Sequence, residues 1–269
     1  MNYHKSVLLN EAIDGLRVRS GSKYIDATLG GGGHASSIIE KGGLVLGIDA
    51  DSEAIEFVSE NQKSKIKNQK LRLARGNFRN IDQIAKENGF ESVSGILFDL
   101  GVSSHQIDAA ERGFSYIKSG PLDMRMDRGL GVKASDLVNA LGKKELVDLF
   151  RNLGEENHAN KIADLILKRR KIAPFKTTDD LTLTLATVYG FRTINDFARV
   201  VSGKRVFQAL RIAVNDELGS LQEALPKALE LLESEGRIAV ITFHSLEDRI
   251  VKRSFIEFEK RGKGLTLTK

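Results

Sequence analysis

Short apolar runs alternate with amphipathic segments along the first hundred residues of the chain. The runs are short enough for buried strands, and the segments between them repeat apolar residues at the spacing of three and four that one helix face requires. This alternation predicts βαβ units and a doubly wound parallel sheet with helices on both faces. The expected strands cover 24–27, 44–48, 71–74 and 95–100, and the expected helices cover 34–41, 52–61 and 81–87.

The alternation stops in the middle of the chain. Between 107 and 205 the apolar positions keep helical spacing, and no segment has a convincing strand pattern. We therefore expect an α/β domain made of residues 1–106 and 206–269, interrupted by an all-helical subdomain at 107–205. The helices expected in this insertion cover 134–141, 143–152, 156–171, 178–189 and 194–201.

The α/β pattern returns after the insertion. Apolar residues from Phe207 to Leu225 repeat at three and four, which predicts one long amphipathic helix, and Pro226 is expected to open a second, short helix in its first turn. A strand at 237–243 and a helix at 246–258 follow. Apolar and polar residues then alternate at 265–268, which predicts the start of a further strand.

Polar residues cluster in a loop after the fourth expected strand. The apolar run that begins at Ile96 ends in Asp99, and Gly101 breaks the strand pattern, so a carboxylate is expected at the edge of the sheet. The stretch 103–127 is then dense in Ser, Asp, Glu and Arg, with Phe, Tyr and Met between them. Long loops in compact domains are usually functional or disordered, and the apolar residues favour function.

A glycine-rich turn follows the first expected strand. Asp26 ends that strand, and four glycines from Gly30 onward lead to His34 at a helix start. Glycines leave room for a ligand against the backbone and near the positive end of the helix. Asp49 ends the second strand 19 positions after Gly30, close to the spacing at which an acid accepts hydrogen bonds from ribose in nucleotide-binding folds. Together these features favour an adenosine-type ligand over a purely structural turn.

Two more residues follow strands at the same expected edge. Phe78 comes after the third strand, where its ring would lie against an adenine or pack in the core. Asp99 ends the fourth strand, at the crevice where open α/β sheets bind ligands. Because a buried carboxylate without a positive partner is costly, we favour a functional role for Asp99.

Composition limits the classes of protein that fit. The 269 residues, 41% hydrophobic and 29% charged, are enough to bury a sizeable core. The absence of Cys excludes disulfides, thiolate metal sites and cysteine nucleophiles. The histidines show no zinc-ligand spacing, so no metal is expected.

Charge and hydropathy bear on partners and location. The net charge of +5 suggests an anionic partner such as nucleic acid without establishing one. We find no signal-peptide pattern at the start and no apolar window of about 18 residues, so a cytoplasmic protein without a membrane segment is expected.

Seven segments of the chain resemble a known family. They are DATLGGGGH, GIDAD, FDLGVSSHQID, ERGFS, GPLDMRMD, FQALRIAVNDEL and FHSLEDRIVK. Together they resemble the ribosomal RNA small subunit methyltransferase H family, also called MraW, from His4 to about Arg253. The resemblance implies a class I (Rossmann-like) methyltransferase fold with an inserted helical domain. It also implies S-adenosyl-L-methionine as cofactor and the exocyclic N4 of a cytidine in the decoding region of 16S rRNA as substrate.

The resemblance also implies roles for individual positions. Cofactor contacts are expected at Gly32, Gly33, His34, Asp49, Phe78, Asp99 and Gln106. His105 stands where the family usually has Pro, so the path of the loop before Gln106 is less fixed. The family also continues through a final strand containing an NPRSRS-like segment that this sequence lacks, so we expect the C-terminal strand to be missing.

Candidates for catalysis and RNA binding follow from the chemistry of the implied reaction. Cytosine N4 is a poor nucleophile because its lone pair is delocalised, so a hydrogen-bond acceptor on the amino group would help. Asp99 and Asp123 are the candidates for that acceptor. Arg205 and Arg211, near the point where the insertion rejoins the sheet, are the candidates for RNA contact.

Some alternatives stay open at this point. A nicotinamide-dependent oxidoreductase would share the glycine turn and Asp49, and a noncatalytic ribosome-assembly factor would bind RNA without methyl transfer. The expected partner is 16S rRNA, within the small ribosomal subunit rather than free. The oligomeric state is not fixed by the sequence, with a homodimer among the alternatives.

Overall fold

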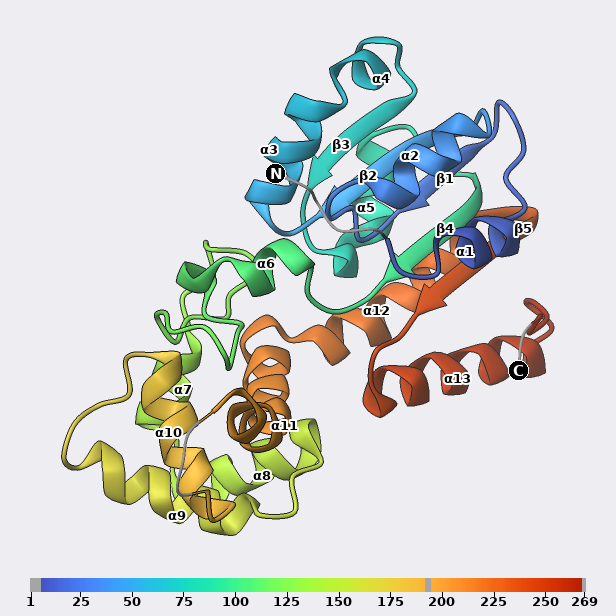
Figure 1. The fold of residues 1–269 in the computed structure, drawn as a ribbon. Coiled ribbons are helices and arrows are strands. Elements are labelled where there is room, and N and C mark those ends of the chain that lie inside the picture. The colour runs from blue at the N-terminus through green and yellow to red at the C-terminus, as the bar shows by residue number, and fades with distance from the viewer. Residues whose placement is uncertain (1–5, 192–194, 268–269) are drawn as a thin grey trace. The chain divides into compact units, whose positions relative to one another are not determined.

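The chain forms two compact units. The computed structural model describes residues 6–191 and 195–267 (Figure 1). One unit consists of Met1–Ser103 and Leu218–Lys269, and the other of Ser104–Glu217. We call them the sheet unit and the helical unit. The helical unit begins close to residue 107, where the sequence analysis placed the start of the insertion. It ends at Glu217, twelve residues after the expected end at 205, because the helix before Glu217 packs with the helical unit.

The sheet unit contains five parallel strands in the order β3-β2-β1-β4-β5. Their bounds are β1 Lys23–Asp26, β2 Leu44–Asp49, β3 Leu71–Arg75, β4 Val93–Asp99 and β5 Leu232–Ile241. The order confirms the predicted α/β class, because the chain winds outward from β1 to β3 and then returns to β4 on the other side. In register, Asp26 lies opposite Gly47 of β2 and Leu97 of β4.

Helices cover both faces of this sheet, because successive side chains of a strand point to opposite faces. Ile25, Ile96 and Phe98 pack with helices on one face, whereas Tyr24 and Leu97 pack with helices on the other. The first group of helices is α5 Ile81–Glu87, α12 Glu217–Glu230 and α13 Ser245–Lys260, and the second is α1 Leu9–Leu16, α2 Gly33–Glu40 and α3 Ser52–Asn61. A short helix α4 Lys63–Lys67 and a 3-10 turn η1 Phe78–Asn80 complete the unit.

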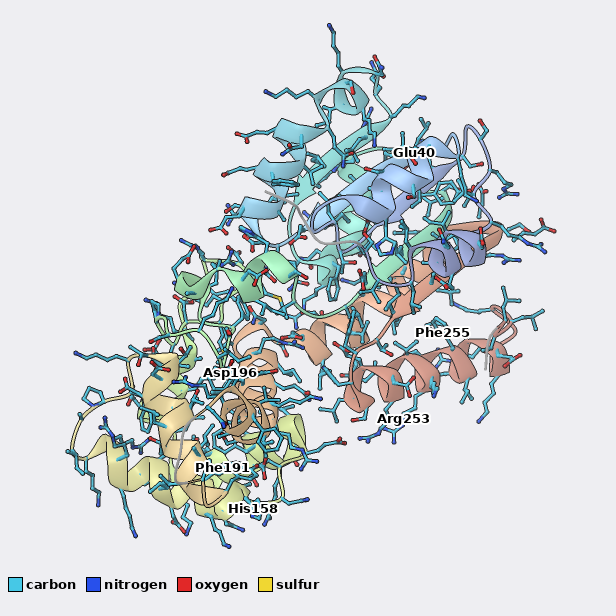
Figure 2. The ribbon with its side chains drawn as sticks, in the orientation of Figure 1. Glu40, His158, Phe191, Asp196, Arg253 and Phe255 are labelled. Atoms are coloured by element: carbon cyan, nitrogen blue, oxygen red, sulfur yellow. The ribbon has the colours of Figure 1, made fainter. Side chains whose placement is uncertain are left out.

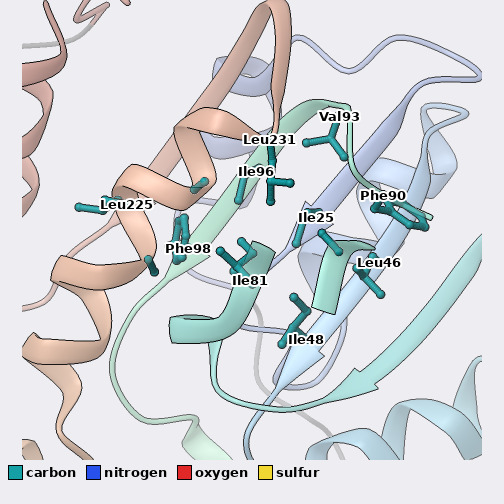
Figure 3. Packing of buried hydrophobic residues seen from close by; sticks show 14 of the residues in the cluster. Ile25, Leu46, Ile48, Ile81, Phe90, Val93, Ile96, Phe98, Leu225 and Leu231 are labelled. Atoms are coloured by element: carbon teal, nitrogen blue, oxygen red, sulfur yellow. The ribbon is translucent and has the colours of Figure 1, made fainter. Parts of the chain in front are cut away.

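The first face carries the larger apolar core (Figure 3). Figure 3 shows Ile25, Leu46 and Ile96 from three neighbouring strands, with Ile81 of α5 and Leu225 of α12 packed over them. Each such side chain contributes about 1.5–3 kcal/mol when fully buried. This packing fixes the strand ends from which the candidate site is built.

The described regular elements of the helical unit are helices, joined by loops that include the long segment 113–133, and one isolated bridge joins Pro121 and Thr177. Its elements are α6 Ser104–Asp108, η2 Ala110–Arg112, α7 Ala134–Ala140, α8 Lys143–Gly154, α9 Ala159–Arg170, α10 Thr178–Val188 and α11 Asp196–Asn215. Gly154 lets α8 approach α11 closely, because a Cβ there would lie 2.6 Å from the carbonyl oxygen of Arg205.

The backbone of the polar loop at 110–136 is held by two polar side chains, Arg112 within the loop and Asn215 at the end of α11. Arg112 is buried and donates to the carbonyl oxygens of Arg125 and Met126 at 3.1 and 2.9 Å. Asn215, at the end of α11, donates to the carbonyl of Met124 at 2.8 Å and accepts from the N–H of Met126 at 2.7 Å. Polar side chains that suggested a functional loop therefore bind backbone N–H and carbonyl groups, which would otherwise be buried without hydrogen bonds.

Three predictions for the C-terminal part are wrong. The long helix expected from Phe207 to Leu225 is two helices, because Asp216 between α11 and α12 adopts a left-handed conformation with φ 47°. Pro226 lies inside α12 instead of opening a new helix, since the buried face of α12 continues past it through Ala228. Residues 264–267 form no strand, and Leu265 is exposed; Thr268 lies outside the described residues.

Within the described ranges 6–191 and 195–267, we find no helix both long and apolar enough to cross a membrane.

We predict that Asn215→Ala destabilises the helical unit. The change removes three hydrogen bonds, to Met124, Met126 and Arg211, and leaves partly buried backbone groups unpaired. The expected loss is about 2–3 kcal/mol in free energy of unfolding, measured by urea denaturation. Asn61→Ala is the matched control, because exposed Asn61 makes one local hydrogen bond to Phe57; its loss should stay within about 0.5 kcal/mol. Equal losses in the two variants would contradict the structural role of Asn215.

Candidate functional site

Three neighbouring strands of the sheet unit each end in an aspartate. Asp26 is the last residue of β1, Asp49 of β2 and Asp99 of β4, and these strands are adjacent in the order β2-β1-β4. Because parallel strands end at the same edge, the three carboxylates share the carboxyl edge of the sheet. This edge is the candidate site.

The glycine turn after β1 is tied directly to β2. The N–H of Gly30 donates to Oδ2 of Asp49 at 2.8 Å, and the N–H of Leu29 donates to the carbonyl of Ile48 at 2.9 Å. The sequence spacing suggested that the glycine turn and Asp49 serve the same ligand, and in the structure the two are in direct contact. This contact places an acidic side chain beside the bare backbone of the turn.

The glycines of this turn serve different purposes. A Cβ on Gly30, whose φ is 48°, would meet nothing within 4 Å. A Cβ on Gly32 would instead lie 2.6 Å from Nε2 of Gln62, and one on Gly33 would lie 2.1 Å from Oγ of Ser6. Open space beside the turn, which a ligand needs, is thus found at Gly30, whereas Gly32 and Gly33 admit other parts of the chain.

Asp49 keeps acceptor capacity for a ligand. Its Oδ1 accepts the N–H of Asp51 at 2.9 Å and its Oδ2 accepts the N–H of Gly30. A carboxylate has about four lone-pair sites, so about two remain. Burial raises the pKa of Asp49 to about 6, although the backbone donors oppose the rise. The group is therefore mostly ionised at neutral pH and able to accept from two hydroxyls.

Asp26 is fully buried and only half satisfied. Its Oδ1 accepts the N–H of Thr28 at 3.3 Å, but among the described residues its Oδ2 has no hydrogen-bond partner. Burial, together with the charge of Asp49, raises the pKa of Asp26 to about 7. An unpaired buried carboxylate oxygen is costly, which points to a cationic or hydrogen-donating group that completes the site.

The two carboxylate oxygens of Asp99 have different surroundings. Its Oδ2 lies 3.6 Å from Nδ1 of His34, and its N–H donates to Oγ1 of Thr28 at 2.6 Å. Its Oδ1 has no hydrogen-bond partner in the described part of the chain. Burial raises the pKa of Asp99 to about 6, and burial lowers the pKa of His34. Asp99 is therefore placed to accept a proton.

The segment before α1 contacts the ring of His34. Nε2 of His34 lies 3.1 Å from the carbonyl oxygen of Val7, and Ser6 occupies the space beside Gly33. The buried His34 side chain thus links the segment before α1 to Asp99 at the end of β4.

The FHSLEDRI motif fixes the start of α13 at the same edge. Oε2 of Glu247 accepts the N–H of Phe243 at 2.8 Å and of His244 at 3.3 Å. Glu247 is buried, and its charge is one of the causes that raise the pKa of Asp99, after burial itself. The motif therefore acts as a helix cap next to the acids of the site.

Phe78 serves the core, at least in part. Its ring packs edge-on against Phe98 with centroids 5.7 Å apart, and the residue is only partly buried. The two roles that the sequence left open are compatible, because one part of the ring packs inward while another stays accessible.

Asp123, in the helical unit, is neutralised. Arg125 donates to both of its carboxylate oxygens, at 2.7 and 2.9 Å. Burial acts to raise the pKa of Asp123, but the hydrogen bonds from Arg125 outweigh it, and the pKa is lower than usual. This arrangement favours a structural role for Asp123 and makes it a poor proton acceptor.

The other three predicted residues of the helical unit differ in exposure. Gln106 is buried on α6, and Arg205 is exposed on α11. Arg211 forms a two-pronged ion pair with Glu217, with both nitrogen to oxygen distances 2.8 Å. The pair occupies the guanidinium edge that would bind phosphate, which weakens the case for Arg211 as an RNA contact.

A profile of the MraW methylase family matches residues 1–268. The chain belongs to the MraW methylase family. Three relatives carry the name ribosomal RNA small subunit methyltransferase H. The one from Halothermothrix orenii is 47% identical over 263 residues, which is 96% of this chain and 82% of that protein. Those from Fusobacterium nucleatum and Brevibacillus brevis are 45% and 43% identical over 257 and 261 residues, covering 94% and 96% of this chain and 80% and 82% of theirs.

Membership of the MraW methylase family gives the carboxyl edge a chemical purpose. A methylase needs a methyl donor, and the sheet unit has open space beside Gly30 and the carboxylate of Asp49 at the same edge. Neither an oxidoreductase nor a noncatalytic assembly factor is favoured by a methylase family match over residues 1–268.

Several residues of the edge were not singled out from the sequence. Asp26 was seen as a strand end without a role, and Thr28 and Ser6 were not considered. The signal for Asp26 was available, because its last-in-strand position matches that of Asp49 and Asp99. The contacts of Thr28 and Ser6 join positions far apart in the chain, so no local pattern marks them.

We predict that Asp26→Asn stabilises the protein at high pH. The pKa of Asp26 is higher in the folded protein than in the unfolded chain, so the protonated carboxyl stabilises the fold. This stabilisation is complete below about pH 4 and is lost as the pH rises through about 7. Asn stays neutral, so at pH 8 without cofactor the variant should be more stable by up to several kcal/mol, and at pH 4.5 by no more than about 1 kcal/mol.

Urea unfolding at the two pH values measures this difference. The control is Asp14→Asn, which makes the same chemical change at an exposed carboxylate beside Lys41 and should shift stability by less than about 1 kcal/mol at either pH. A variant of Asp26 that is less stable than the wild type at pH 8 would contradict the prediction.

Proposed function

We propose that this chain methylates the exocyclic N4 of a cytidine in 16S rRNA with S-adenosyl-L-methionine as the donor. The observation that carries the proposal is the carboxyl edge of the sheet in a member of the MraW methylase family: a glycine turn with open space, an acid with free acceptor sites and two buried carboxylate oxygens without partners. The names of the relatives support small-subunit rRNA as the substrate.

The residues present fit an adenosyl sulfonium donor. Asp49 has room to accept from both ribose hydroxyls, and Gly30 leaves the backbone accessible. The unpartnered oxygens of Asp26 and Asp99 suit a ligand that carries positive charge, because a nearby cation offsets the cost of burying them. S-Adenosyl-L-methionine supplies, when bound, a methyl group on a positively charged sulfur.

Phe78 and the glycine turn complete the proposed donor contacts. Phe78 follows β3, next to the strand that carries Asp49, and its partly accessible ring suits an adenine. Gly32 and Gly33 shape the turn indirectly, by admitting Gln62 and Ser6, and His34 acts mainly through its side-chain contacts. Gln106 stays a predicted contact.

Asp99 is the proposed proton acceptor. In the transfer the amino nitrogen would gain a bond to the methyl carbon while the bond from that carbon to sulfur breaks, and the sulfur would leave as a neutral thioether. The nitrogen would also lose one proton. Among the described residues Oδ1 of Asp99 has no hydrogen-bond partner. A pKa of about 6 leaves the carboxylate ionised at neutral pH yet able to take up the proton that the amino group releases. Nδ1 of His34 lies 3.6 Å from the other oxygen, Oδ2. Asp123 is not part of this proposal, because Arg125 occupies it.

The helical unit is the proposed reader of RNA. Its exposed Arg205 suits a phosphate contact, whereas Arg211 is engaged by Glu217. We expect the assembled small subunit to be the substrate, in the cytoplasm where ribosomes form, and we include a homodimer among the states to be measured.

The test of the function is methyl transfer to unmodified small subunits. The protein is incubated with labelled S-adenosyl-L-methionine and subunits or free 16S rRNA, and the product nucleosides are identified by mass spectrometry. N4-methylcytidine at one position is the expected result. Binding of subunits without methyl transfer would favour an assembly factor, and binding of reduced nicotinamide but not the sulfonium donor would favour an oxidoreductase.

We predict that Asp49→Asn weakens donor binding by about 10- to 100-fold, since an amide replaces one of the two acceptor oxygens with a donor. Calorimetric titration with S-adenosyl-L-methionine measures the effect. Asp14→Asn again provides the control, with an unchanged dissociation constant. Unchanged affinity in the Asp49 variant would remove this carboxylate from the proposed site.

We predict that Asp99→Asn lowers kcat by about 100- to 10,000-fold. In the wild type, kcat should rise with pH through about 6 as the carboxylate ionises, and the variant should lose this rise. A pH series of single-turnover rates, with donor and RNA saturating, separates the two effects. A variant that keeps the wild-type rise would show that another group accepts the proton.

A further inference from the structure

Helix α13 carries a row of basic residues on the face that points away from the sheet. A helix turns about 100° per residue, so positions three, four, seven and eleven apart share a face. Val251, Phe255 and Phe258 of α13 pack against the core of the sheet unit. The opposite face, which we call the α13 stripe, consists of Arg249, Lys252, Arg253, Ile256 and Lys260.

All five residues of the α13 stripe are exposed. In Figure 2, Arg253 and Phe255 point to opposite sides of α13, with Phe255 on the side of the sheet. Acidic residues of α13 flank the stripe without entering it: Lys252 pairs with Asp248 at 2.9 Å. Among the described residues, no ion pair involves Arg253 or Lys260. Their charges are therefore available to an anionic partner.

The α13 stripe begins next to the candidate site. The cap made by Glu247 fixes the first turn of α13 directly after β5, whose last residue, Ile241, accepts the N–H of Leu100 at 3.1 Å. Leu100 follows Asp99, and the negative charge of Glu247 is one of the causes that raise the pKa of Asp99, after burial. From there the stripe extends along α13 for roughly 16 Å between Arg249 and Lys260, at about 1.5 Å per residue.

We propose that the α13 stripe binds the phosphate backbone of the RNA that flanks the target nucleotide. The inference rests on the proposed function, which brings a polyanion to the carboxyl edge where the stripe begins. Basic side chains without base-reading partners position RNA independently of sequence. A membrane surface fits less well, because the stripe has a single exposed apolar residue, Ile256, instead of an apolar face.

The stripe therefore adds a second RNA contact that belongs to the sheet unit itself. The RNA beside the target base would then be held by the same unit that carries Asp99 and the proposed donor site. This role concerns binding and position, and none of the stripe residues takes part in the chemical step.

The test compares two variants with the same change in charge. In the stripe variant, Lys252, Arg253 and Lys260 are replaced by Gln; Arg249 is kept because it has a contact of its own. In the control variant, exposed Lys63, Lys67 and Lys70 are replaced by Gln; they lie on α4 and just before β3, which is the opposite edge strand from β5. Binding of unmodified 16S rRNA is measured over a range of salt concentrations.

The stripe variant should bind rRNA about 10- to 100-fold more weakly, and its slope of log affinity against log salt should fall by about 2. The control variant should behave like the wild type. Both variants should keep the wild-type melting temperature and the same dissociation constant for S-adenosyl-L-methionine. A single Arg253→Glu variant gives a second measurement with less change to the helix.

Unchanged affinity and salt slope in the stripe variant would overturn the inference. Equal losses in the stripe and control variants would also overturn it, because they would reflect net charge alone. Methyl transfer by the wild type is measured in the same samples. Its absence would count against the proposed function, while a selective loss of rRNA binding in the stripe variant would still support the stripe.

Discussion

The structure depends on placing three carboxylates at one edge of a sheet with little positive charge to balance them. Asp26, Asp49 and Asp99 are held there by apolar packing on both sheet faces, and burial raises the pKa of each. The core thus stabilises an edge that is electrostatically unfavourable when empty. In the proposed function, a ligand that carries positive charge would offset that cost, so its binding would also stabilise the fold.

Much of the sheet unit could be predicted from the sequence, because its strands are buried runs between glycine turns and its helices have one apolar face. The spacing also indicated that the glycine turn and Asp49 belong together, but the hydrogen bond between Gly30 and Asp49 was not predicted. The partners of Asp99 did not follow, because Thr28 and His34 reach it through strand adjacency rather than through a local motif.

The most distinctive loop illustrates the limit of reading polarity as function. In GPLDMRMD the charged residues Asp123 and Arg125 pair with each other, and Arg112 and Asn215 hold its backbone. Buried backbone groups need polar side chains as hydrogen-bond partners, and so does a bound substrate. The sequence alone therefore does not distinguish a polar residue that holds the backbone from one that binds a substrate. The helix break at Asp216 was missed for a related reason, because apolar spacing continues on both sides of it.

Ser6 and Val7, the first described residues, contact the glycine turn and the histidine that follows it. Ser6 fills the space beside Gly33, and Val7 anchors His34. A substitution at Ser6 or Val7 would therefore act far from its place in the sequence, because it would shift the imidazole that lies 3.6 Å from the carboxylate of Asp99.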